Sequence, residues 1–324
     1  MAVDSVLIVS TNWIGDAVMG MPALQCFRRE NPESKITVLT KLGLKALWEM
    51  HPNIDDVLIM GKPIPTARKL RGMHFDRSYI FPNSLRSAFV PWLAGVPNRR
   101  GFRGHWRHLL LNEIITPPDG HQQYEYKAIL GVEGELSAPQ LNVPDKSTKA
   151  IIEKLSGYGV DDNAPLITLL PGAARGPSKR WPTEHFIELA KKLRSSAGAS
   201  VILGGGPDDA VACDDIAAAA GEGVFNLAGK TTVPEWSALL KISDCVVSND
   251  SGGMHLATAV ESPVVGIFGI TDPEKTGPLG KSKVLKKGTL SNRNIARSSE
   301  EAAGALGSIT SNEVYEAVCG LLED

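Results

Sequence analysis

Short apolar runs alternate with segments of helical length along this chain, and the alternation occurs twice. The runs occupy residues 6–9, 36–39, 57–60 and 78–81 in the first half, and 166–170, 201–203, 245–247 and 264–268 in the second. Apolar strands that alternate with helices are typical of parallel sheets with helices on both faces. The sequence therefore predicts an α/β chain with two Rossmann-like, doubly wound domains that face a central cleft.

The two halves are separated by residues 139–165, which are rich in Pro, Asp and Lys. This composition is typical of a domain boundary, although residues 149–155 have helical character. The predicted domains are residues 1–155 and 156–310, followed by a final helix at 311–324 that packs back on the first domain. Thr310 and Glu313 have the spacing of a capping box for this helix. Thr183 is the expected N-cap of another helix, at 183–195.

Composition excludes several classes of protein. The 324 residues carry a net charge of −2, which argues against a polycation that binds nucleic acid. The four cysteines are far apart and form no CxxC pair, as in a reduced cytosolic protein without a zinc site. No apolar stretch approaches the length of a spanning helix, and the first residues do not resemble a signal peptide. We therefore expect a soluble, cytoplasmic protein.

The charge is nevertheless unevenly distributed. Residues 77–112 contain no Asp or Glu but six arginines, namely Arg77, Arg86, Arg99, Arg100, Arg103 and Arg107. A surface of this kind suits an anionic partner. An ordinary solvated surface, balanced by acids elsewhere in space, explains the same pattern equally well.

Four polar, glycine-bearing loops follow predicted strands, and two of them suit a nucleotide diphosphate. In the loop at 248–257, glycines allow backbone N–H groups to approach an anion at a helix N-terminus, while Asp250 suits a sugar hydroxyl better than a phosphate. The simpler alternative is a helix capped by Asp250 or Ser251, with His255 packed in its first turn. The loop at 170–182 carries Arg175, Lys179 and Arg180, which suit a diphosphate or are merely solvated.

The other two loops carry candidate carboxylates. In the loop at 204–209, Asp208 or Asp209 is placed to bind ribose hydroxyls or to cap the next helix. In the loop at 12–23, Asp16 stands among small apolar residues, where a carboxylate can act as a general base. An N-cap is the alternative for Asp16. Together the loops predict a base-bearing domain and a nucleotide-binding domain.

Three stretches resemble the motifs of the glycosyltransferase family 9 heptosyltransferases. They are WIGDAVMGMPAL, PGAARGPSKRWPTEHFIELAKKL and VSNDSGGMHLATAVESPVVGIFGITDPEKTGP. In the first half, FPNSLRSAFVPWLAGVPNRRGFRG followed by LLLNE is most similar to the heptosyltransferase II branch. The resemblance covers residues 6–280 and implies a GT-B fold. It also implies an inverting transfer of L-glycero-D-manno-heptose from ADP-heptose to a heptose of the lipopolysaccharide inner core.

The resemblance also implies roles for particular residues. The catalytic pair is Asp16 as base and Lys179 on the donor diphosphate. The implied donor-binding residues are Asp209, Thr231, Thr232, Asp250, Ser251, Gly252, Gly253 and His255. The implied acceptor-binding residues are Asn83, Arg86, Arg99 and Arg103. No metal site stands out, and no cofactor is required.

The implied partners are ADP-heptose and the lipopolysaccharide core, without nucleic acid. The chain is expected to act as a monomer at the cytoplasmic face of the inner membrane, although no amphipathic anchor stands out in the sequence. Three alternatives remain open from the residues alone. They are a family 9 transferase that uses ADP-heptose or another nucleotide-sugar on a different acceptor, a non-hydrolysing nucleotide-sugar epimerase, and a nucleotide-binding module without activity.

Overall fold

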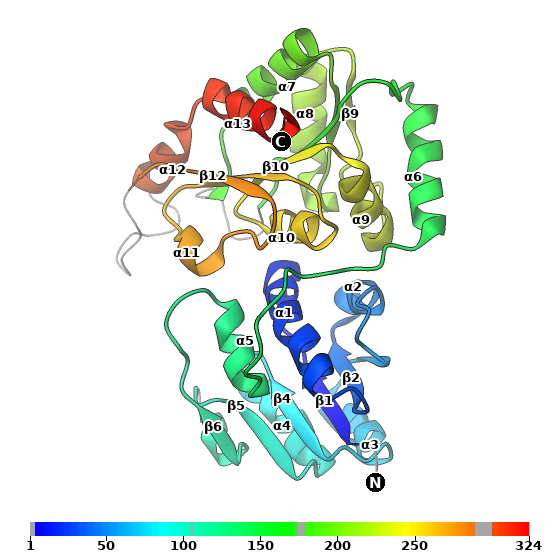
Figure 1. Cartoon of the computed structure of the whole chain (residues 1–324), viewed down its shortest axis with the longest axis vertical. Helices are drawn as coiled ribbons and strands as arrows, with labels where there is room; N and C mark the ends of the chain where they lie inside the picture. Colours follow the sequence, from blue (N-terminus) through cyan, green and yellow to red (C-terminus); the bar gives the residue numbers. More distant parts are fainter. Residues whose placement is uncertain (1–3, 105, 174–178, 289–299, 324) are drawn as a thin grey trace. The chain divides into compact units, whose positions relative to one another are not determined.

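The computed structural model describes residues 4–104, 106–173, 179–288 and 300–323 (Figure 1). The chain divides into two compact units, Met1–Asn142 and Val143–Asp324. The boundary expected at residue 155 falls inside helix α6 (Asp145–Gly157). This helix belongs to the second unit because it packs against α9 (Val233–Ile242) and because Lys154 donates a 2.8 Å hydrogen bond to the carbonyl oxygen of Lys230.

The first unit contains a six-stranded parallel sheet in the order β3-β2-β1-β4-β5-β6. Its strands are β1 (Ser5–Val9), β2 (Lys35–Thr40), β3 (Asp56–Ile59), β4 (Arg77–Ile80), β5 (Asn98–Phe102) and β6 (Glu113–Ile115). Four of them lie at the predicted apolar runs. The other two, β5 and β6, were not predicted because they lie toward the edge and carry polar or exposed residues.

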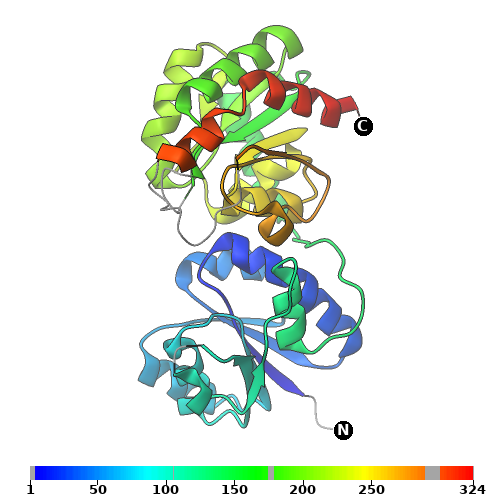
Figure 2. The ribbon, with the colours of Figure 1, turned by 90° about the vertical axis from the view of Figure 1, so that its left-hand side faces the viewer.

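Helices cover both faces of this sheet. The helices are α1 (Ile14–Glu30), α2 (Lys45–Glu49), α3 (Pro63–Arg71), α4 (Leu85–Ala94) and α5 (Gln123–Leu130), with short 3-10 turns η1 (Leu42–Leu44) and η2 (Arg107–Leu109). The connection through α1 leads toward the β3 edge of the sheet, whereas the connections through α3 and α4 lead toward the β6 edge. Because such crossovers are right-handed, α3 and α4 cover the face opposite α1. Helix α1 packs with α5, and α3 packs with α4 (Figures 1 and 2).

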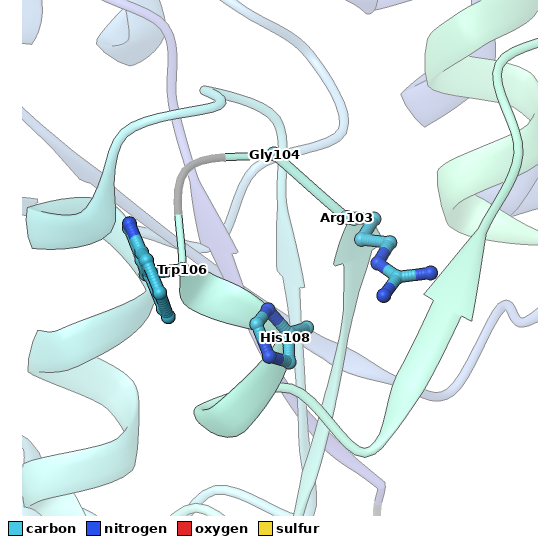
Figure 3. Close-up of a pocket in the computed structure, with 4 residues that line it drawn as sticks. All are labelled: Arg103, Gly104, Trp106 and His108. Atoms are coloured by element: carbon cyan, nitrogen blue, oxygen red, sulfur yellow. The ribbon is translucent and has the colours of Figure 1, made fainter.

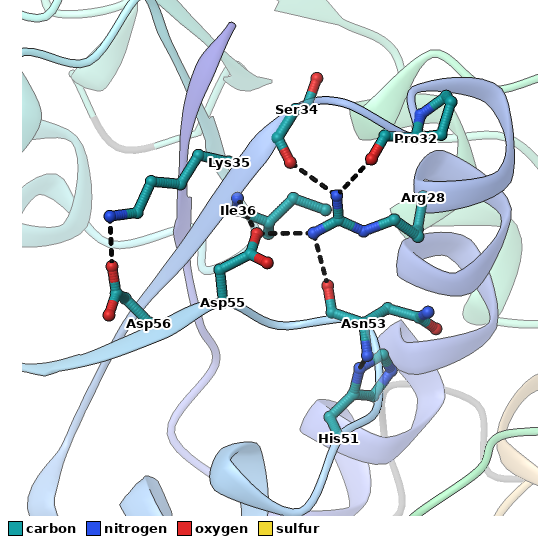
Figure 4. A network of polar contacts seen from close by, with 9 residues as sticks. All are labelled: Arg28, Pro32, Ser34, Lys35, Ile36, His51, Asn53, Asp55 and Asp56. Atoms are coloured by element: carbon teal, nitrogen blue, oxygen red, sulfur yellow. Dashed lines mark hydrogen bonds and ion pairs between the residues drawn. The ribbon is translucent and has the colours of Figure 1, made fainter. Parts of the chain in front are cut away.

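A polar network holds the last turn of α1 against the segments that precede β2 and β3 (Figure 4). Arg28 donates hydrogen bonds to the carbonyl oxygens of Ser34 and Asn53, at 2.6 and 3.2 Å. It also forms an ion pair of 2.6 Å with Asp55. Nearby, His51 is 3% exposed and accepts a hydrogen bond from the backbone N–H of Asn53. Burial lowers the pKa of His51 to about 3, so its imidazole is neutral in the folded unit.

The second unit repeats the same sheet topology, with strand order β12-β11-β10-β7-β8-β9. All neighbouring strands are parallel. The strands are β7 (Leu166–Leu170), β8 (Ser200–Leu203), β9 (Val224–Asn226), β10 (Cys245–Asn249), β11 (Val264–Phe268) and β12 (Ser282–Lys286). The remaining helical segments are α7 (Thr183–Ala197), η4 (Pro207–Asp209), α8 (Ala210–Ala220), α10 (Gly252–Ala259), α11 (Pro273–Thr276), α12 (Glu300–Gly307) and α13 (Ser311–Glu323). The predicted α/β class with two Rossmann-like sheets is therefore confirmed.

Two details of the second unit differ from the sequence analysis. Helix α13 packs against α7 and the strands β10, β11 and β12, within the second unit rather than on the first. Its predicted capping box is confirmed, because Thr310 and Glu313 exchange side-chain and backbone hydrogen bonds of 2.8 and 3.3 Å. The N-cap of α7 is Pro182, one residue before Thr183, and no side chain caps this helix. In the part of the chain that the structure describes, no helix is long and apolar enough to cross a bilayer.

Candidate functional site

Each sheet has one point where the order of its strands reverses direction. In the first unit this point lies between β1 and β4, and in the second it lies between β7 and β10. In open α/β sheets, ligands bind outside the carboxyl ends of the strands at such a switch point. The four segments that follow these strands carry Asp16, Asn83, Lys179 and Asp250. The topology therefore places predicted site residues at both switch points.

Asp16 lies in the first turn of α1 and does not cap it. The helix begins at Ile14, with Trp13 at the N-cap position. A carboxylate in the first turn is favoured by the helix dipole. The residue is half-buried, and the side-chain amide of Gln122 donates a 3.2 Å hydrogen bond to its Oδ1 atom. Asp16 stands among buried apolar residues as expected, and in addition an amide contacts it directly.

Gln122 was not predicted as a site residue, and its orientation is fixed by neighbouring rings. Its amide also donates a 2.8 Å hydrogen bond to the hydroxyl of Tyr126. The ring of Tyr126 packs against Phe81 with 4.7 Å between centroids. Phe81 directly follows β4, so the rings connect α5 to the switch point of this sheet. The only sequence signal for this contact is a polar residue at the start of α5, more than one hundred residues after Asp16.

The loop after β5 forms an open pocket of about 550 Å³ near the same edge of the sheet (Figure 3). Its lining residues are Arg103, Gly104, Trp106 and His108. Trp106 is 78% exposed and has a left-handed backbone with φ of 61°, which is unusual for a bulky residue. His105 lies outside the described residues. Arg107 ties this loop to the segment after β4, because its guanidinium donates a hydrogen bond to the carbonyl oxygen of Pro82, next to Asn83.

Arg107 itself is a buried cation. Its side chain is fully buried, and burial lowers its pKa to about 10, so it remains charged at neutral pH. Within the described residues, its Nε and Nη2 atoms have no hydrogen-bond partner. Buried donors are seldom left unpaired. In the described residues Arg107 also forms no ion pair, so its positive charge is uncompensated in the loop that carries the pocket.

Two of the predicted acceptor-binding arginines have structural contacts. Arg99 lies at the start of β5, at the opposite end of the strand from the pocket, and donates hydrogen bonds to the carbonyl oxygens of Leu110 and Pro97 at 2.6 and 3.0 Å. The structure therefore does not bring Arg99 together with Asn83 and Arg103. Arg86, in the first turn of α4, donates a 2.8 Å hydrogen bond to the carbonyl oxygen of Gly61.

In the second unit, the structure brings Lys179 and Asp250 together. The ammonium of Lys179 contacts the Asp250 carboxylate, although the two residues are 71 positions apart. The side chains are 17% and 8% exposed, so the ion pair is largely removed from water. The sequence predicted both residues but assigned them to different groups of the donor, and did not predict that they pair. Neither of them caps a helix.

Asn249 holds the two loops together and was not predicted. Its side-chain amide donates a 2.7 Å hydrogen bond to the carbonyl oxygen of Pro171, and its Oδ1 atom accepts a 3.0 Å hydrogen bond from the backbone N–H of Trp181. It is fully buried. One residue at the end of β10 therefore fixes both ends of the loop that carries Lys179. The sequence analysis placed Asn249 in the loop after the strand and gave it no role.

Asp209 lies against the same loop. Its carboxylate accepts a 2.9 Å hydrogen bond from the backbone N–H of Gly206 and lies 3.9 Å from the guanidinium of Arg180. A Cβ atom on Gly172 would lie 2.3 Å from this carboxylate, so only glycine allows the approach. The Asp209 carboxylate therefore caps the turn at Gly206 and also lies beside the cationic loop. This position groups Asp209 with the candidate donor residues.

Helix α10 begins at Gly252, directly after the Asp250 loop. Ser251 occupies the N-cap position without a side-chain hydrogen bond to the helix. A Cβ atom on Gly253 would lie 2.6 Å from Leu170 and 3.0 Å from Trp236, so this glycine lets the helix start pack against the end of β7. His255 is 3% exposed, which agrees with a packed first-turn residue.

The two threonines near α9 differ in their contacts. Thr232 is the N-cap of α9 and forms a capping box with Glu235, whose carboxylate accepts 2.7 and 2.8 Å hydrogen bonds from the Thr232 N–H and hydroxyl. Its hydroxyl is thus already engaged by the helix cap. Thr231 precedes this cap and is half-buried. Among the residues that the structure describes, no group of three or more His, Cys, Asp or Glu side chains is placed to hold a metal ion.

These contacts define what each unit can do. The second unit presents an ammonium and a helix N-terminus at its switch point, which suits a diphosphate. The first unit presents a half-buried carboxylate held by an amide, which suits proton acceptance, and a cationic pocket in the loop after β5.

Comparisons with known proteins agree with this geometry. The sequence model of glycosyltransferase family 9 (heptosyltransferase) matches residues 65–302. Lipopolysaccharide heptosyltransferase 2 of Escherichia coli K12 is 30% identical over 347 residues, covering 98% of this chain and 98% of that protein. Lipopolysaccharide heptosyltransferase 3 of Escherichia coli is 33% identical over 282 residues, covering 80% and 81%.

A solved structure supports the same relationship. The E. coli ADP-heptose lipopolysaccharide heptosyltransferase II superposes with a TM-score of 0.87 at 29% identity and covers 98% of both chains. This similarity confirms the predicted GT-B class. The family model spans most of this chain, and the relatives align over nearly its full length. This chain therefore belongs to glycosyltransferase family 9.

Proposed function

We propose that this enzyme transfers a heptose from ADP-heptose to a heptose of the lipopolysaccharide inner core, with inversion at the anomeric carbon. The names of the related heptosyltransferases 2 and 3 support this substrate class. The observation that carries the proposal is the Lys179–Asp250 pair at the switch point of the second unit. A buried ammonium held there, beside a helix N-terminus, suits the diphosphate of a nucleotide-sugar.

The donor binds the second unit in this account. The diphosphate contacts Lys179 and the first N–H groups of α10, at Gly252 and Gly253. Asp250 keeps the ammonium in place before the donor arrives. Once the diphosphate shares that ammonium, the second carboxylate oxygen of Asp250 is available to a heptose hydroxyl. The remaining donor contacts are assigned to Asp209 near the ribose, Thr231 and the backbone at Thr232 near adenine, and Ser251 and His255 near the phosphate and sugar.

Asp16 is the proposed base. Transfer requires that the acceptor hydroxyl meet the anomeric carbon in line with the departing ADP oxygen. Asp16 accepts the hydroxyl proton as the new C–O bond forms and the bond to ADP breaks, while the amide of Gln122 keeps the carboxylate oriented. The transition state has oxocarbenium character, as in glycoside hydrolysis. Negative charge then grows on the diphosphate, where Lys179 and the start of α10 stabilise it.

The acceptor side is assigned to Asn83, Arg103 and the pocket beside Trp106. Phosphates or acidic sugars of the core suit the positive charge there, and the buried Arg107 reinforces it. We propose that the enzyme works as a monomer at the cytoplasmic face of the inner membrane, without a bound metal or nucleic acid. A transfer to a different core acceptor is the second candidate, because the relatives include both heptosyltransferase 2 and heptosyltransferase 3.

An acceptor panel tests the proposal. The protein is incubated with ADP-heptose and with lipid A cores that carry no heptose, one heptose or two heptoses, and ADP release is followed. The proposal predicts release with the singly heptosylated core, and release slower by a factor of about 10² or more with the Asp16→Asn variant as control. Release only with the doubly heptosylated core would favour the second candidate. Tight ADP binding without release on any core would identify a binding module and contradict the proposal.

A further inference from the structure

The outer surface of α3 and α4 combines exposed apolar side chains with uncompensated cations. We infer that this surface, the α3–α4 face, docks on a bilayer that contains anionic lipids. It is defined by Ile64, Arg68, Lys69, Arg71, Leu85, Arg86, Phe89 and Trp92. This inference goes beyond the transfer reaction, because binding to a bilayer needs neither donor nor acceptor.

The apolar part of the face is a helical stripe whose side chains are exposed or half-buried within the first unit. Leu85, Phe89 and Trp92 follow i, i+4, i+7 spacing on α4, so they share one side of the helix. Leu85 is 48% and Trp92 44% exposed, whereas Ala88 and Val90 on the inner side belong to the core against the sheet. The rings of Phe89 and Trp92 stack with 5.7 Å between centroids. An ordinary surface helix has charged residues at these outer positions.

The neighbouring helix supplies cations at the same spacing. On α3, Ile64, Arg68 and Arg71 share one side, while Thr66, Ala67 and Leu70 are buried against the sheet. Ile64 is 65% exposed, and Arg68 and Lys69 are also exposed. A hydrophobic residue flanked by basic residues on one helix side is typical of helices that lie in a membrane interface.

Two hydrogen bonds join the helices into one surface. Near their first turns, Arg86 of α4 donates a 2.8 Å hydrogen bond to the carbonyl oxygen of Gly61, before α3. At their last turns, Arg71 of α3 donates a 2.6 Å hydrogen bond to the carbonyl oxygen of Leu93 in α4. The two helices therefore run parallel and side by side, and their outer residues form a continuous face whose position relative to the sheet is fixed.

The charge of this region is strongly one-sided. Residues 57–112 contain a single acid, Asp76, which accepts a 2.8 Å hydrogen bond from the backbone N–H of Ser5. The same stretch contains ten cations, namely Lys62, Arg68, Lys69, Arg71, Arg77, Arg86, Arg99, Arg100, Arg103 and Arg107. Within the described residues, those on α3 and α4 form no ion pair. Uncompensated cations around an apolar stripe complement an anionic lipid surface.

The face also adjoins the candidate acceptor pocket. Turn η2 contacts α4 and directly follows Trp106 of the pocket. Its last residue, Leu109, is 72% exposed. A soluble anion would need the cations but not the exposed leucines and tryptophans. A bilayer uses both, because the aromatic rings enter the interface while the cations meet the head groups. Docking here places the acceptor pocket at the membrane surface.

Vesicle flotation tests the inference with the full chain and no substrate. We expect the protein to float with phosphatidylcholine vesicles that contain phosphatidylglycerol, and not with phosphatidylcholine alone, and to be released by high salt. The double variants Leu85→Ser/Trp92→Ser and Arg68→Glu/Lys69→Glu should each reduce the bound fraction about tenfold or more. The matched control Val211→Ser/Lys191→Glu changes an exposed apolar residue and a cation in the second unit, and should bind like the unchanged protein.

Three results would overturn the inference. They are no flotation of the unchanged protein with anionic vesicles, unchanged binding of both face variants, and an equal loss in the control. A concentration-dependent dimer that the face variants abolish would instead identify a second copy as the occupant. Retained ADP affinity and an unchanged unfolding midpoint show that a variant is folded. A protein that floats normally but releases no ADP contradicts the proposed transfer and leaves the docking face intact.

Discussion

The two units have the same strand order but treat charge in opposite ways at their switch points. Among the described residues of the second site, two cations meet a carboxylate, with Lys179 on Asp250 and Arg180 near Asp209. In the described part of the first unit, Arg86 bonds to a backbone carbonyl, and Arg86, Arg103 and Arg107 form no ion pair. The contrast indicates different roles for the two sites. The second site is assembled and nearly neutral before its ligand arrives, whereas the first keeps its charge for an anionic partner.

Removing the ammonium of Lys179 from the second site should have the largest effect on activity. We expect Lys179→Met to lower kcat/KM for ADP-heptose by about 10²–10³, the effect of losing one group that stabilises charge in a transition state. The variant also leaves the largely buried Asp250 without a partner, so its unfolding midpoint should fall. Steady-state kinetics and thermal unfolding measure the two effects.

A double variant separates binding from folding at this pair. Lys179→Met/Asp250→Asn should recover stability without recovering turnover, and Lys191→Met on the surface of α7 serves as the control. Turnover of Lys179→Met within a few-fold of the unchanged enzyme would refute the role assigned to this lysine.

Loss of the buried Asn249 amide should weaken the framework of the second site. Asn249→Leu leaves the carbonyl of Pro171 and the N–H of Trp181 buried without their partner, which should cost about 2–4 kcal/mol of unfolding free energy in the second unit. Chemical denaturation measures this loss, and Asn163→Ala in an exposed loop is the matched control. An unchanged denaturation midpoint would show that the two loops are held by other contacts.

Acid should lower the folding stability of the first unit over a pH range that is set by the pKa values of His51 in the folded and unfolded chain. The imidazole has a pKa of about 3 in the fold and takes up a proton near pH 6.5 when unfolded. Between these values the unfolded chain binds more protons, so stability falls as pH decreases through 6.5. At pH 5 the loss should be about 2 kcal/mol relative to pH 7.5.

Hydrogen exchange in peptides from β1 and β2 reports this loss locally. His51→Gln should make the protection factor, which is the exchange rate corrected for its intrinsic pH dependence, nearly independent of pH over the same range, whatever the effect of the substitution on stability. A pH dependence that persists in this variant would assign the acid sensitivity to another group.

The smallest effects are expected from substitutions of two arginines in the first unit. One substitution should affect acceptor binding and the other should affect folding. Arg103 lines the pocket, and Arg103→Ala should raise the acceptor KM about tenfold, or about 1.4 kcal/mol, with an unchanged Tm. Arg99→Ala should instead lower Tm and leave the acceptor KM unchanged, because its guanidinium binds only structural carbonyls in the described contacts. The reverse pattern would place Arg99, and not Arg103, on the acceptor.

The sequence predicted those features of the fold and of the site that depend on a single local pattern. Apolar runs located eight strands, and polar loops after them located Asp16, Lys179 and Asp250 at the switch points. Strand β5, next to the edge of its sheet, was missed because most of its residues are polar. The contacts that orient the site were also missed, since Gln122 lies 106 residues from Asp16 and Asn249 lies 68 residues from Trp181. A pairing over such separations depends on how strands are ordered, which no local pattern records.

The docking face shows the same limit. The sequence showed an excess of arginine but no amphipathic anchor, because the face is divided between two helices that are 14 residues apart. Each helix alone exposes only a few apolar or basic residues. Their outer sides become one surface through the hydrogen bonds of Arg71 and Arg86, which join the helices at both ends.

The central claim is that the first unit supplies the base and the second unit holds the donor. The most direct measurement compares turnover and ADP-heptose affinity in Asp16→Asn, with calorimetry for binding and ADP release for turnover. The account predicts that kcat falls by a factor of about 10² or more while the donor Kd stays within about twofold. Near-normal turnover, or a loss of donor affinity as large as the loss of turnover, would contradict it.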